Sequence, residues 1–413
     1  MMRRTSGLQN GVARFARVWS VVSASLLLAT AGWSQSLTWL GTLPGGSRSY
    51  ASGVSADGSV VVGRAFNAAG QARAFRWQNG VMQDLGTLGG GWSGAWGVSA
   101  DGSVVVGEAG NAAGQARAFR WQNGVMQDLG TLGGDWSEAY GVSADGSVVV
   151  GVAGNAAGAY RAFRWQNGVM QDLGTLGGDR SEARGVSADG SVVVGWAVNA
   201  DGQRRAFRWQ NGVMQDLGTL PGGSESDAYG VSADGSVVVG YAYNAAGQSR
   251  AFRWQNGVMQ DLGTLGGANS WAYGVSADGS VVVGNAQNAA GRYRAFRWTA
   301  AGGMEDLNIT YASLLTSGSY LSNARAISPD GRYIVGEGYN ATTGRGEAFL
   351  LDTGTTRRDG DVNGDGCVDD ADLLQVLFAF GNTGANLPED LNGDNTVDDA
   401  DLLEVLFNFG SGC

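Results

Sequence analysis

The chain has 413 residues, with no His, no Lys and 71 Gly, far above the roughly 7% Gly of an average protein. Without His and Lys, it has no Ser-His-Asp or Cys-His catalytic group, His metal ligand, GxxxxGK[ST] phosphate loop or Lys Schiff base. The net charge of −11 resides in residues 353–413, with 13 acids and two Arg, and this argues against nucleic-acid binding, which needs a basic face.

Residues 1–35 have the pattern of a secretory signal peptide. Several Arg precede a short apolar run from Val18 to Leu28, and Ala29-Thr30-Ala31 supplies the small residues of a cleavage site. The run is too short for a comfortable membrane span, and we expect none later in the chain. We therefore expect a secreted protein, extracellular or at the cell surface. An uncleaved amphipathic leader is the alternative.

Two motifs recur along residues 36–352 with a period of 44 or 45 residues in most copies. One is Arg-Ala-Phe-Arg-Trp. The other is Ser-Ala-Asp-Gly, and its Asp residues, the last from a variant copy, are Asp57, Asp101, Asp145, Asp189, Asp234, Asp278 and Asp330. A period of this length is typical of stacked supersecondary units.

Each unit contains four segments that favour antiparallel strands. In one copy these segments are residues 228–232, 236–240, 250–255 and 258–265. An Asp-Gly turn separates the first two, and an Asn-Gly turn, the strongest short hairpin signal, separates the last two. The second segment, with its run of three Val, reads as a strand buried on both faces.

The distribution of these segments predicts a closed ring. The last copy lacks its fourth strand, while a lone segment of that type, Leu37–Leu43, precedes the first copy. An open solenoid gives no reason for this arrangement, whereas in a ring the N-terminal strand completes the last sheet. We therefore predict an all-β, seven-bladed β-propeller with four-stranded blades over residues 36–352.

The pattern Ala-Phe-Arg-Trp…Asn-Gly-Val-Met-Gln-Asp-Leu-Gly-Thr-Leu-Gly-Gly resembles the HAF-type extracellular repeat of bacterial secreted proteins. That repeat usually begins with His, and Arg stands in its place in six copies here, from Arg73 to Arg294. The variant motif Ser328-Pro329-Asp330-Gly331 also resembles the blade start of WD-like and TolB-like propellers, which supports the same fold.

Residues that repeat in every unit are explained by structure. The hairpin pattern places Trp77 opposite Met82 and Arg73 diagonal to Asp84, which suits sheets packed on both faces. An acid in every blade is the opposite of a unique active site, so we predict no catalytic residue. If the chain is an enzyme, Glu138, Glu182 and Glu225 are the residues to test.

Residues that differ between units gather in two kinds of connection, from second to third strand and from fourth strand to the next unit. Both lie on one face of a propeller, and aromatics interleaved with charges suit a ligand face for a glycan or another protein. Neutral drift, with the aromatics packed between blades, is the alternative. The candidate ligand residues are Trp92, Trp96, Trp136, Tyr140, Arg180, Arg184, Trp196, Tyr229, Tyr241 and Tyr273.

Residues 359–413, after a linker of residues 353–358, contain two related acidic loops, each followed by an apolar stretch of helix length. Their oxygen ligands stand at positions 1, 3, 5, 9 and 12, with the main-chain carbonyl of position 7 available, as in an EF-hand loop for Ca²⁺. We predict two Ca²⁺ ions, held by Asp361, Asn363, Asp365, Cys367, Asp369 and Asp372, and by Asp390, Asn392, Asp394, Thr396, Asp398 and Asp401.

The two loop-plus-helix units resemble a type I dockerin domain. The resemblance implies docking to a cohesin through loop positions 10 and 11 and along the helices. Positions 17 and 18 are Leu377-Phe378 and Leu406-Phe407, not the Ser, Thr and basic residues common in cellulosomal dockerins, so the calcium carries over better than the cohesin partner. These apolar residues either contact another partner or form the core of a small domain, and we expect the core for most of them.

The two cysteines lie in this segment, and Cys367–Cys413 is the disulfide to expect in a secreted chain, with two free thiols as the alternative. The sequence thus predicts a secreted, non-catalytic binding or attachment protein, with a propeller scaffold and a calcium-dependent docking module. A carbohydrate-active enzyme is the runner-up, because dockerin-like tails often accompany such enzymes. A structural spacer is the third reading.

Overall fold

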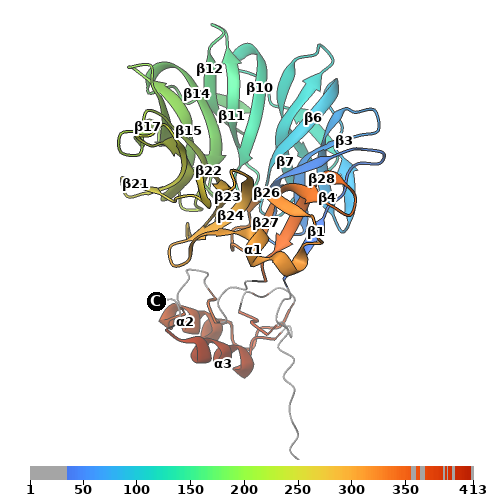
Figure 1. Ribbon diagram of the computed structural model, residues 1–413, viewed down its shortest axis with the longest axis vertical. Helices are drawn as coiled ribbons and strands as arrows, with labels where there is room; N and C mark the ends of the chain where they lie inside the picture. Colours follow the sequence, from blue (N-terminus) through green and yellow to red (C-terminus); the bar gives the residue numbers. More distant parts are fainter. Residues whose placement is uncertain are drawn as a thin grey trace, which may run out of the picture. The chain divides into compact units, whose positions relative to one another are not determined.

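The computed structural model describes residues 35–354, 360–362, 368–384, 387, 389–392 and 396–410. Residues 35–354 form seven four-stranded antiparallel sheets. Figure 1 shows the sheets following one another in sequence order, and the inner strands of neighbouring sheets contact one another, the last (β26) and the first (β2) included. The predicted seven-bladed β-propeller is therefore confirmed.

Every blade uses its strands in the same order, from the inside outward. The inner strands are β2 (Ser49–Val54), β6 (Gly89–Val98), β10 (Gly133–Val142), β14 (Gly177–Val186), β18 (Ser226–Val231), β22 (Gly266–Val275) and β26 (Tyr320–Ile327). The second strands are β3 (Val60–Phe66), β7 (Val104–Asn111), β11 (Val148–Asn155), β15 (Val192–Asn199), β19 (Val237–Tyr243), β23 (Val281–Asn288) and β27 (Tyr333–Asn340).

The outer half of each blade is a tight hairpin. The third strands are β4 (Ala72–Gln78), β8 (Ala116–Gln122), β12 (Tyr160–Gln166), β16 (Arg204–Gln210), β20 (Ser249–Gln255), β24 (Tyr293–Thr299) and β28 (Arg345–Asp352). The fourth strands are β5 (Val81–Asp84), β9 (Val125–Asp128), β13 (Val169–Asp172), β17 (Val213–Asp216), β21 (Val258–Asp261), β25 (Gly303–Asp306) and, in the last blade, β1 (Ser36–Trp39).

The N-terminal strand closes the ring as the sequence predicts. In Figure 1, β1 lies beside β28, and the two strands pair from Ser36 with Asp352 to Trp39 with Phe349. The Trp39 and Phe349 rings meet edge to face with their centroids 6.3 Å apart. The last blade is therefore built from both ends of the propeller segment.

The repeated motifs fix the turns. Asn79 and Gly80 have φ of 52° and 80°, the left-handed values that an Asn-Gly hairpin needs. At the other turn, the Ser55 hydroxyl donates to the Asp57 carboxylate at 2.6 Å and accepts the Val60 N–H at 2.9 Å. Register and pairing in the outer hairpin also follow the prediction, with Trp77 opposite Met82 and an Arg73–Asp84 ion pair at 3.6 Å.

Apolar residues of the second and third strands form the core between blades. One such cluster joins Val60 and Val62 of the first blade to Val105 and Phe119 of the second, all without exposed surface. Burial of each of these side chains stabilises the fold by about 1.5–3 kcal/mol. The core thus consists of interfaces that repeat around the ring.

A belt of backbone hydrogen bonds also joins the blades. The N–H of Ala56 donates to the carbonyl of Ala100 in the next blade at 2.8 Å, and equivalent bonds continue to Ala277, which donates to Pro329. Pro329 has no N–H, so the belt has no such bond from the last blade to the first. The β1–β28 pairing joins the two ends of the chain in that last blade.

Between β25 and β26 the chain forms a short helix, α1 (Leu307–Thr310), and a 3₁₀ turn, η1 (Ala312–Leu314). The Asp306 carboxylate caps α1 by accepting the Asn308 N–H at 2.9 Å. Leu307 and Tyr311 are buried in the core between the last two blades. This insertion explains the longer spacing before the seventh copy of the motif.

The C-terminal residues include two helices, α2 (Asp370–Ala379) and α3 (Asp399–Asn408), at the predicted apolar stretches. Each begins with a capping box, in which the N-cap Asp369 or Asp398 is paired with Asp372 or Asp401 three residues later. Among the described residues, no helix is long and apolar enough to span a membrane.

The expectation that most apolar residues of these helices form a core is wrong. Only Val376 and Ala379 of α2 and Val405 of α3 are fully enclosed, together with loop valines. Phe378 is 86% exposed and Phe407 83% exposed, and Leu374, Leu377, Leu403 and Leu406 are about half exposed. Two ten-residue helices are too short to enclose so many large side chains.

Candidate functional site

A β-bulge in every inner strand aims one side chain at the propeller axis. In β18, Ala228 is opposite Gly240 and Gly230 is opposite Val239, which leaves Tyr229 as the extra residue. Bulges of this kind re-aim a side chain without ending the strand pairing. The same irregularity in all seven blades selects Ser52, Trp96, Tyr140, Arg184, Tyr229, Tyr273 and Arg325, which we call the axial ring.

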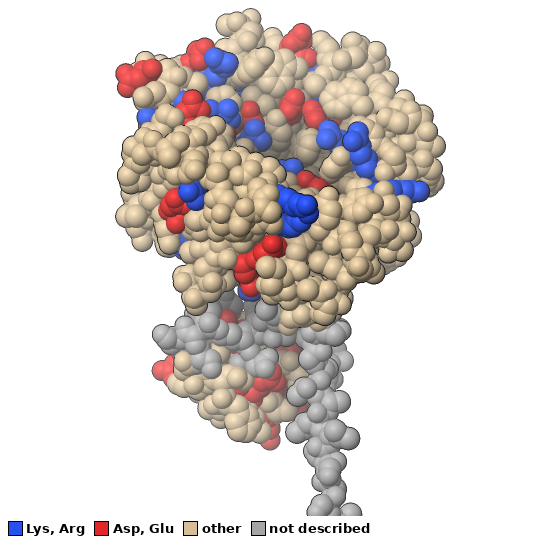
Figure 2. All heavy atoms as spheres, in the orientation of Figure 1, with Lys and Arg blue, Asp and Glu red and all other residues tan. Residues whose placement is uncertain are grey.

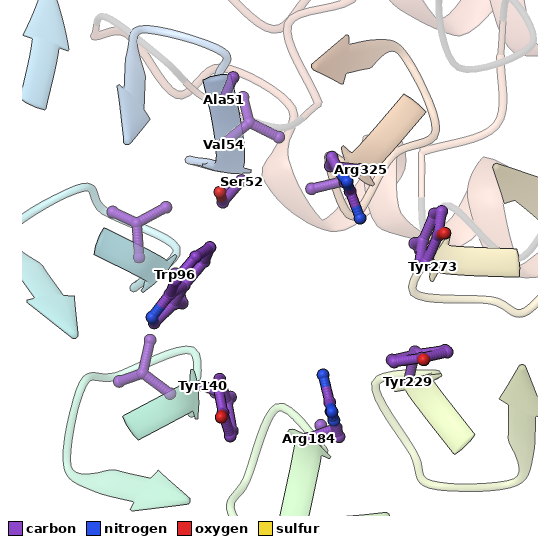
Figure 3. A pocket seen from close by; sticks show the side chains of 18 of the residues that line it. Ala51, Ser52, Val54, Trp96, Tyr140, Arg184, Tyr229, Tyr273 and Arg325 are labelled. Atoms are coloured by element: carbon purple, nitrogen blue, oxygen red, sulfur yellow. The ribbon is translucent and has the colours of Figure 1, made fainter. Parts of the chain in front are cut away.

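The axial ring lines a cavity of about 820 Å³. Figure 3 shows its side chains arranged around an open centre, one from each inner strand. Arg64, Glu138 and Glu337 also line the cavity, and glycine and valine backbone lies between the blades. The cavity is within the size range of small-molecule sites and combines aromatic walls with a few charged groups.

Arg184 lies between two tyrosines of the ring. Its guanidinium is 5.0 Å from the ring centroids of both Tyr140 and Tyr229, and it pairs with Glu182 at 2.6 Å. Burial raises the pKa of Glu182 in spite of the nearby Arg184, and burial raises the pKa of Tyr229 to about 12. Cation–π contacts and the ion pair therefore hold Arg184 pointing into the cavity, as Figure 3 shows.

Arg325 is held in a similar way on the last blade. Its guanidinium lies 4.8 Å from the Tyr273 ring and 3.2 Å from a carboxylate oxygen of Glu337. Tyr273 meets Tyr229 edge to face at 5.3 Å, and burial raises the pKa of Tyr273. A continuous aromatic and guanidinium wall thus runs from Tyr140 to Arg325.

A pair of carboxyl groups adjoins the cavity on its other side. Glu108 of β7 interacts with Glu138 of β10, and the Tyr140 hydroxyl donates to Glu138. Burial, followed by the Glu138 carboxylate, raises the pKa of Glu108 to about 8, so that Glu108 is mostly protonated at pH 7. Sequence analysis selected Glu138 but missed Glu108, whose motif position is occupied by other residue types in most blades.

Behind the ring lies an ion pair whose carboxylate is buried. The Arg204 guanidinium donates to both carboxylate oxygens of Asp227, at 2.5 and 2.6 Å, and stacks 3.9 Å from the Trp196 ring centroid. Asp227 is almost fully buried, and burial raises its pKa in spite of Arg204. Because Trp196 and Tyr241 pack around this pair, they support the ring from the second strands.

Half of the predicted ligand residues meet in the cavity, but on inner strands rather than in connections. These are Trp96, Tyr140, Arg184, Tyr229 and Tyr273. The other five do not line the cavity, and their role in ligand binding stays a prediction. Trp92 lies against Gly110 and Trp136 against Tyr160. Arg180, with 54% of its side chain exposed, pairs with Asp179.

Ser52, Arg64, Arg325 and Glu337 also line the cavity, and they escaped the sequence analysis. Arg325 stands five residues before Asp330, at the same offset as Tyr229 before Asp234, so the repeat alignment contained its signal. Ser52 stands at that offset in the first blade, but its small side chain differs from the aromatic and Arg residues at that offset in the other blades. Arg64 lies on a second strand, and only the fold brings it to the cavity.

Charges of both signs are mixed on the surface outside the cavity. Figure 2 shows Arg and acidic side chains interspersed over the propeller face in view, with no large field of one sign there. The face in view thus offers no large charged patch as a second candidate site, and the cavity stays the candidate.

At the C-terminus, the carboxylates at loop position 12 hold the loop ends. Asp372 is fully buried and accepts the N–H groups of Val362 at 2.7 Å and Asp369 at 3.0 Å. Asp401, also buried, accepts those of Leu391 at 2.6 Å and Asp398 at 2.9 Å. The two loops therefore close in the same way.

Several predicted residues of this segment lie outside the described residues. These are Asn363, Asp365 and Asp394, and both predicted disulfide partners, Cys367 and Cys413. In the part of the segment that is described, no three Asp, Glu, Cys or His side chains cluster as a metal site. The calcium sites and the disulfide thus stay predictions.

No protein-family model and no curated protein matches this chain. Among solved structures, it is similar to the β-propeller domain of the Trilobed protease from Pyrococcus furiosus, with 10% identity, 75% and 98% coverage of the two chains, and a TM-score of 0.48. A putative TolB from Agrobacterium tumefaciens has 15% identity, with 52% of this chain and 80% of that chain covered and a TM-score of 0.41. Prolyl endopeptidases have 13% identity, with 79% of this chain and 51% of theirs covered and a TM-score of 0.47, so the chain spans about half their length. These similarities concern the fold alone.

Proposed function

We propose that the chain is an exported, non-catalytic binding protein whose propeller takes a ligand in the axial cavity. The observation that carries this proposal is the axial ring, seven bulge positions that carry Ser, Trp, Tyr or Arg within an otherwise repeated scaffold. A rigid framework that presents variable aromatic and charged side chains at one point suits ligand recognition. The predicted signal peptide, residues 1–35, supports export, and N-terminal sequencing of the secreted protein tests it.

A matched pair of variants tests binding. The full chain is screened on a glycan array and in pull-downs from extracellular protein, and any ligand is then measured against Tyr229→Ala and Trp136→Ala. Tyr229 lines the cavity, whereas Trp136 packs outside it. We expect a loss of about tenfold or more for Tyr229→Ala and little change for Trp136→Ala. The reverse order, or no ligand of either kind, contradicts the proposal.

We further propose that residues 359–413 form a dockerin-like module with two Ca²⁺ ions, held by the loop residues predicted from the sequence. The described residues fit such an ion: each loop leads into a capped helix, and the donor set is composed of hard oxygens. A bound Ca²⁺ would compensate the mutual repulsion of the loop carboxylates and couple loop order to folding.

Calorimetric titration of the full chain with CaCl₂ tests this. We expect two ions for the unaltered chain and one for Asp372→Ala, because position 12 closes the first loop. Asp370→Asn, an exposed position next to it, is the control and should keep both ions. Binding of no Ca²⁺ would remove the calcium module from the proposal.

The exposed helix residues favour a protein partner for this module. Leu377-Phe378 and Leu406-Phe407 occupy the positions through which dockerins contact their partner, and large exposed apolar groups of this kind mark interaction sites. The partner would present an apolar surface, which differs from the polar contacts of cellulosomal pairs. Capture of extracellular partners with and without Ca²⁺, using Phe378→Ser with Phe407→Ser as the negative variant, tests the docking role.

The Cys367–Cys413 disulfide belongs to the same proposal. It would fasten the C-terminus to the first loop in an oxidising compartment. Mass spectrometry of the non-reduced, digested protein should give a single peptide pair that contains both cysteines. Two alkylated thiols in that experiment would exclude the bond.

A carbohydrate-active enzyme is the second candidate, favoured by the Glu108–Glu138 pair with one protonated carboxyl. The Tyr140 hydroxyl, however, already donates to Glu138, and Arg64 interacts with Glu108, so each carboxyl group has a partner within the chain. This favours a structural role of the pair over an acid and a nucleophile. Polysaccharide hydrolysis that disappears in Glu138→Gln would reverse this order.

A further inference from the structure

Arg64 differs from the other two arginines of the cavity, each of which has a glutamate partner. Its guanidinium has no ion pair with any carboxylate of the described residues, and lies 5.8 Å from the Tyr50 ring and 5.6 Å from the Trp96 ring. The Arg64 Nε is buried without a hydrogen-bond acceptor in residues 35–354. A guanidinium held between aromatic faces without a carboxylate favours an incoming carboxylate.

Glu108 is an acidic group that interacts with Arg64, and burial together with Glu138 raises its pKa to about 8 even though Arg64 acts in the opposite direction. Glu108 is therefore largely uncharged near neutral pH. Since Arg184 is paired with Glu182 and Arg325 with Glu337, Arg64 is the arginine of the cavity lining whose guanidinium has no ion-pair partner among the described residues.

Small residues stand near Arg64. Ser52 is the smallest member of the axial ring, and Gly94 occupies the position that holds Glu138 and Glu182 in the next two blades. A Cβ atom at Gly94 would be in ordinary van der Waals contact with Arg64 Cδ and Trp96 Cζ2, each at 3.6 Å, so a Cβ fits there without displacing either side chain. Where the next two blades carry a glutamate at this position, this blade carries none.

The rest of the cavity is suited to a sugar ring. Trp96, Tyr140, Tyr229 and Tyr273 offer aromatic surface for the apolar face of a pyranose, while the other arginines and Glu138 offer partners for hydroxyl groups. A volume of about 820 Å³ leaves room for one or two sugar residues. A small aliphatic acid would leave the aromatic wall uncovered.

Building on the proposed binding function, we propose that the cavity binds an acidic saccharide. The carboxylate of a uronic-acid-type pyranose would lie on Arg64, and its ring would stack on the aromatic wall. Sugar and acid are both needed in this assignment, since Arg64 recognises the charge and the ring aromatics recognise the pyranose.

Calorimetric titration of the full chain with three probes separates these requirements. Digalacturonate carries both features, its methyl ester lacks the charges, and succinate lacks the ring. We expect digalacturonate to bind at least about tenfold more tightly than either of the others. Equal binding of the ester overturns the role of the carboxylate, and equal binding of succinate overturns the role of the sugar.

Variants then locate the site. Arg64→Gln should lower the affinity for digalacturonate by roughly ten- to a hundredfold, through loss of a charge-assisted contact. Gly94→Glu should lower it more than Gly94→Gln, because Glu supplies Arg64 with a partner inside the chain while Gln adds only similar bulk. Arg180→Gln, an exposed arginine outside the cavity, is the control and should bind as the unaltered chain does.

These experiments distinguish failure of the acidic-saccharide proposal from failure of the proposed binding function. Thermal unfolding of each variant establishes that it is folded. Unchanged binding in Arg64→Gln, or no binding of digalacturonate, overturns the inference. If a neutral glycan or a protein is nevertheless bound through Tyr229, the binding function stands; if the arrays and pull-downs are also empty, both fail.

Discussion

Glu108, beside the cavity, makes the stability of the fold depend on pH. It is protonated in the folded chain because burial and Glu138 raise its pKa to about 8, whereas in the unfolded chain it titrates near its ordinary value of 4.5. Between these values the folded state binds more protons than the unfolded state. The contribution of Glu108 to stability is therefore complete below about pH 4.5 and is lost as the pH rises towards 8.

The absence of His makes this effect measurable, since no imidazole titrates in the same interval. We expect the free energy of unfolding to fall between pH 5 and 8, by at most about 1.4 kcal/mol per pH unit for this group. Glu108→Gln should flatten the slope in urea unfolding. Glu225→Gln, an exposed glutamate, should keep it, and a slope unchanged in Glu108→Gln would refute the assignment.

Asp227 gives a second prediction at the scale of one residue. Asp227→Asn removes the buried carboxylate that accepts from Arg204, whose own side chain is 32% exposed, and we expect a loss of about 1–3 kcal/mol in the free energy of unfolding. Asp179→Asn, in the exposed pair with Arg180, should change it by less than about 1 kcal/mol. Similar losses in both variants would mean that burial does not set the difference.

Single residues also show where sequence reasoning stops. The Trp77–Met82 pairing and the Arg73–Asp84 ion pair follow from strand periodicity and a two-residue turn, and both are present. The axial ring does not follow from periodicity, because a bulge inserts one residue and changes the side to which the chain points. In the first blade Ser52 is the bulge residue, and Tyr50, two residues earlier, also lines the cavity.

At the scale of elements, β1 has the largest consequence, since it completes a blade almost the whole propeller away in sequence. Its presence was predictable from strand counting alone, without any knowledge of contacts. The exposure of the α2 and α3 residues was not predictable, because an apolar stretch of helix length does not reveal how much surface of the rest of the chain is available to cover it.

Trp39→Ala tests the closure. Trp39 packs on Phe349, while Thr38, the next residue, is exposed on the other side of the strand. We expect Trp39→Ala to cost about 2 kcal/mol, less than a fully buried Trp, and to lower the thermal midpoint of the propeller. Thr38→Ala is the control and should stay within about 0.5 kcal/mol of the unaltered chain. Equal midpoints for the two variants would show that β1 does not fasten the ring.

At the scale of the whole molecule, the propeller and the C-terminal segment have separate hydrophobic clusters and depend on different interactions. The propeller is stabilised by packing between blades and the closing strand. The C-terminal helices share a small cluster of valines, with loop ends held by Asp372 and Asp401. The proposed Ca²⁺ ions would stabilise the C-terminal segment and not the propeller.

Scanning calorimetry of the full chain should therefore give two transitions. EDTA should lower or abolish the smaller one, because metal binding is linked to folding of that segment, and leave the larger one in place. Phe378→Ser, at an exposed position, should move neither. One cooperative transition that shifts as a whole with EDTA would mean that the two parts unfold together.

The bulges carry a consequence for how this protein can change. A bulge residue has no counterpart across the ladder, so replacing it leaves the pairing of the strand intact. Seven such positions face one space, each on a blade whose framework is nearly a copy of the next. Exchange of whole blades by recombination between repeats, or a gene library that varies only these seven codons, would generate new specificities while the architecture stays the same.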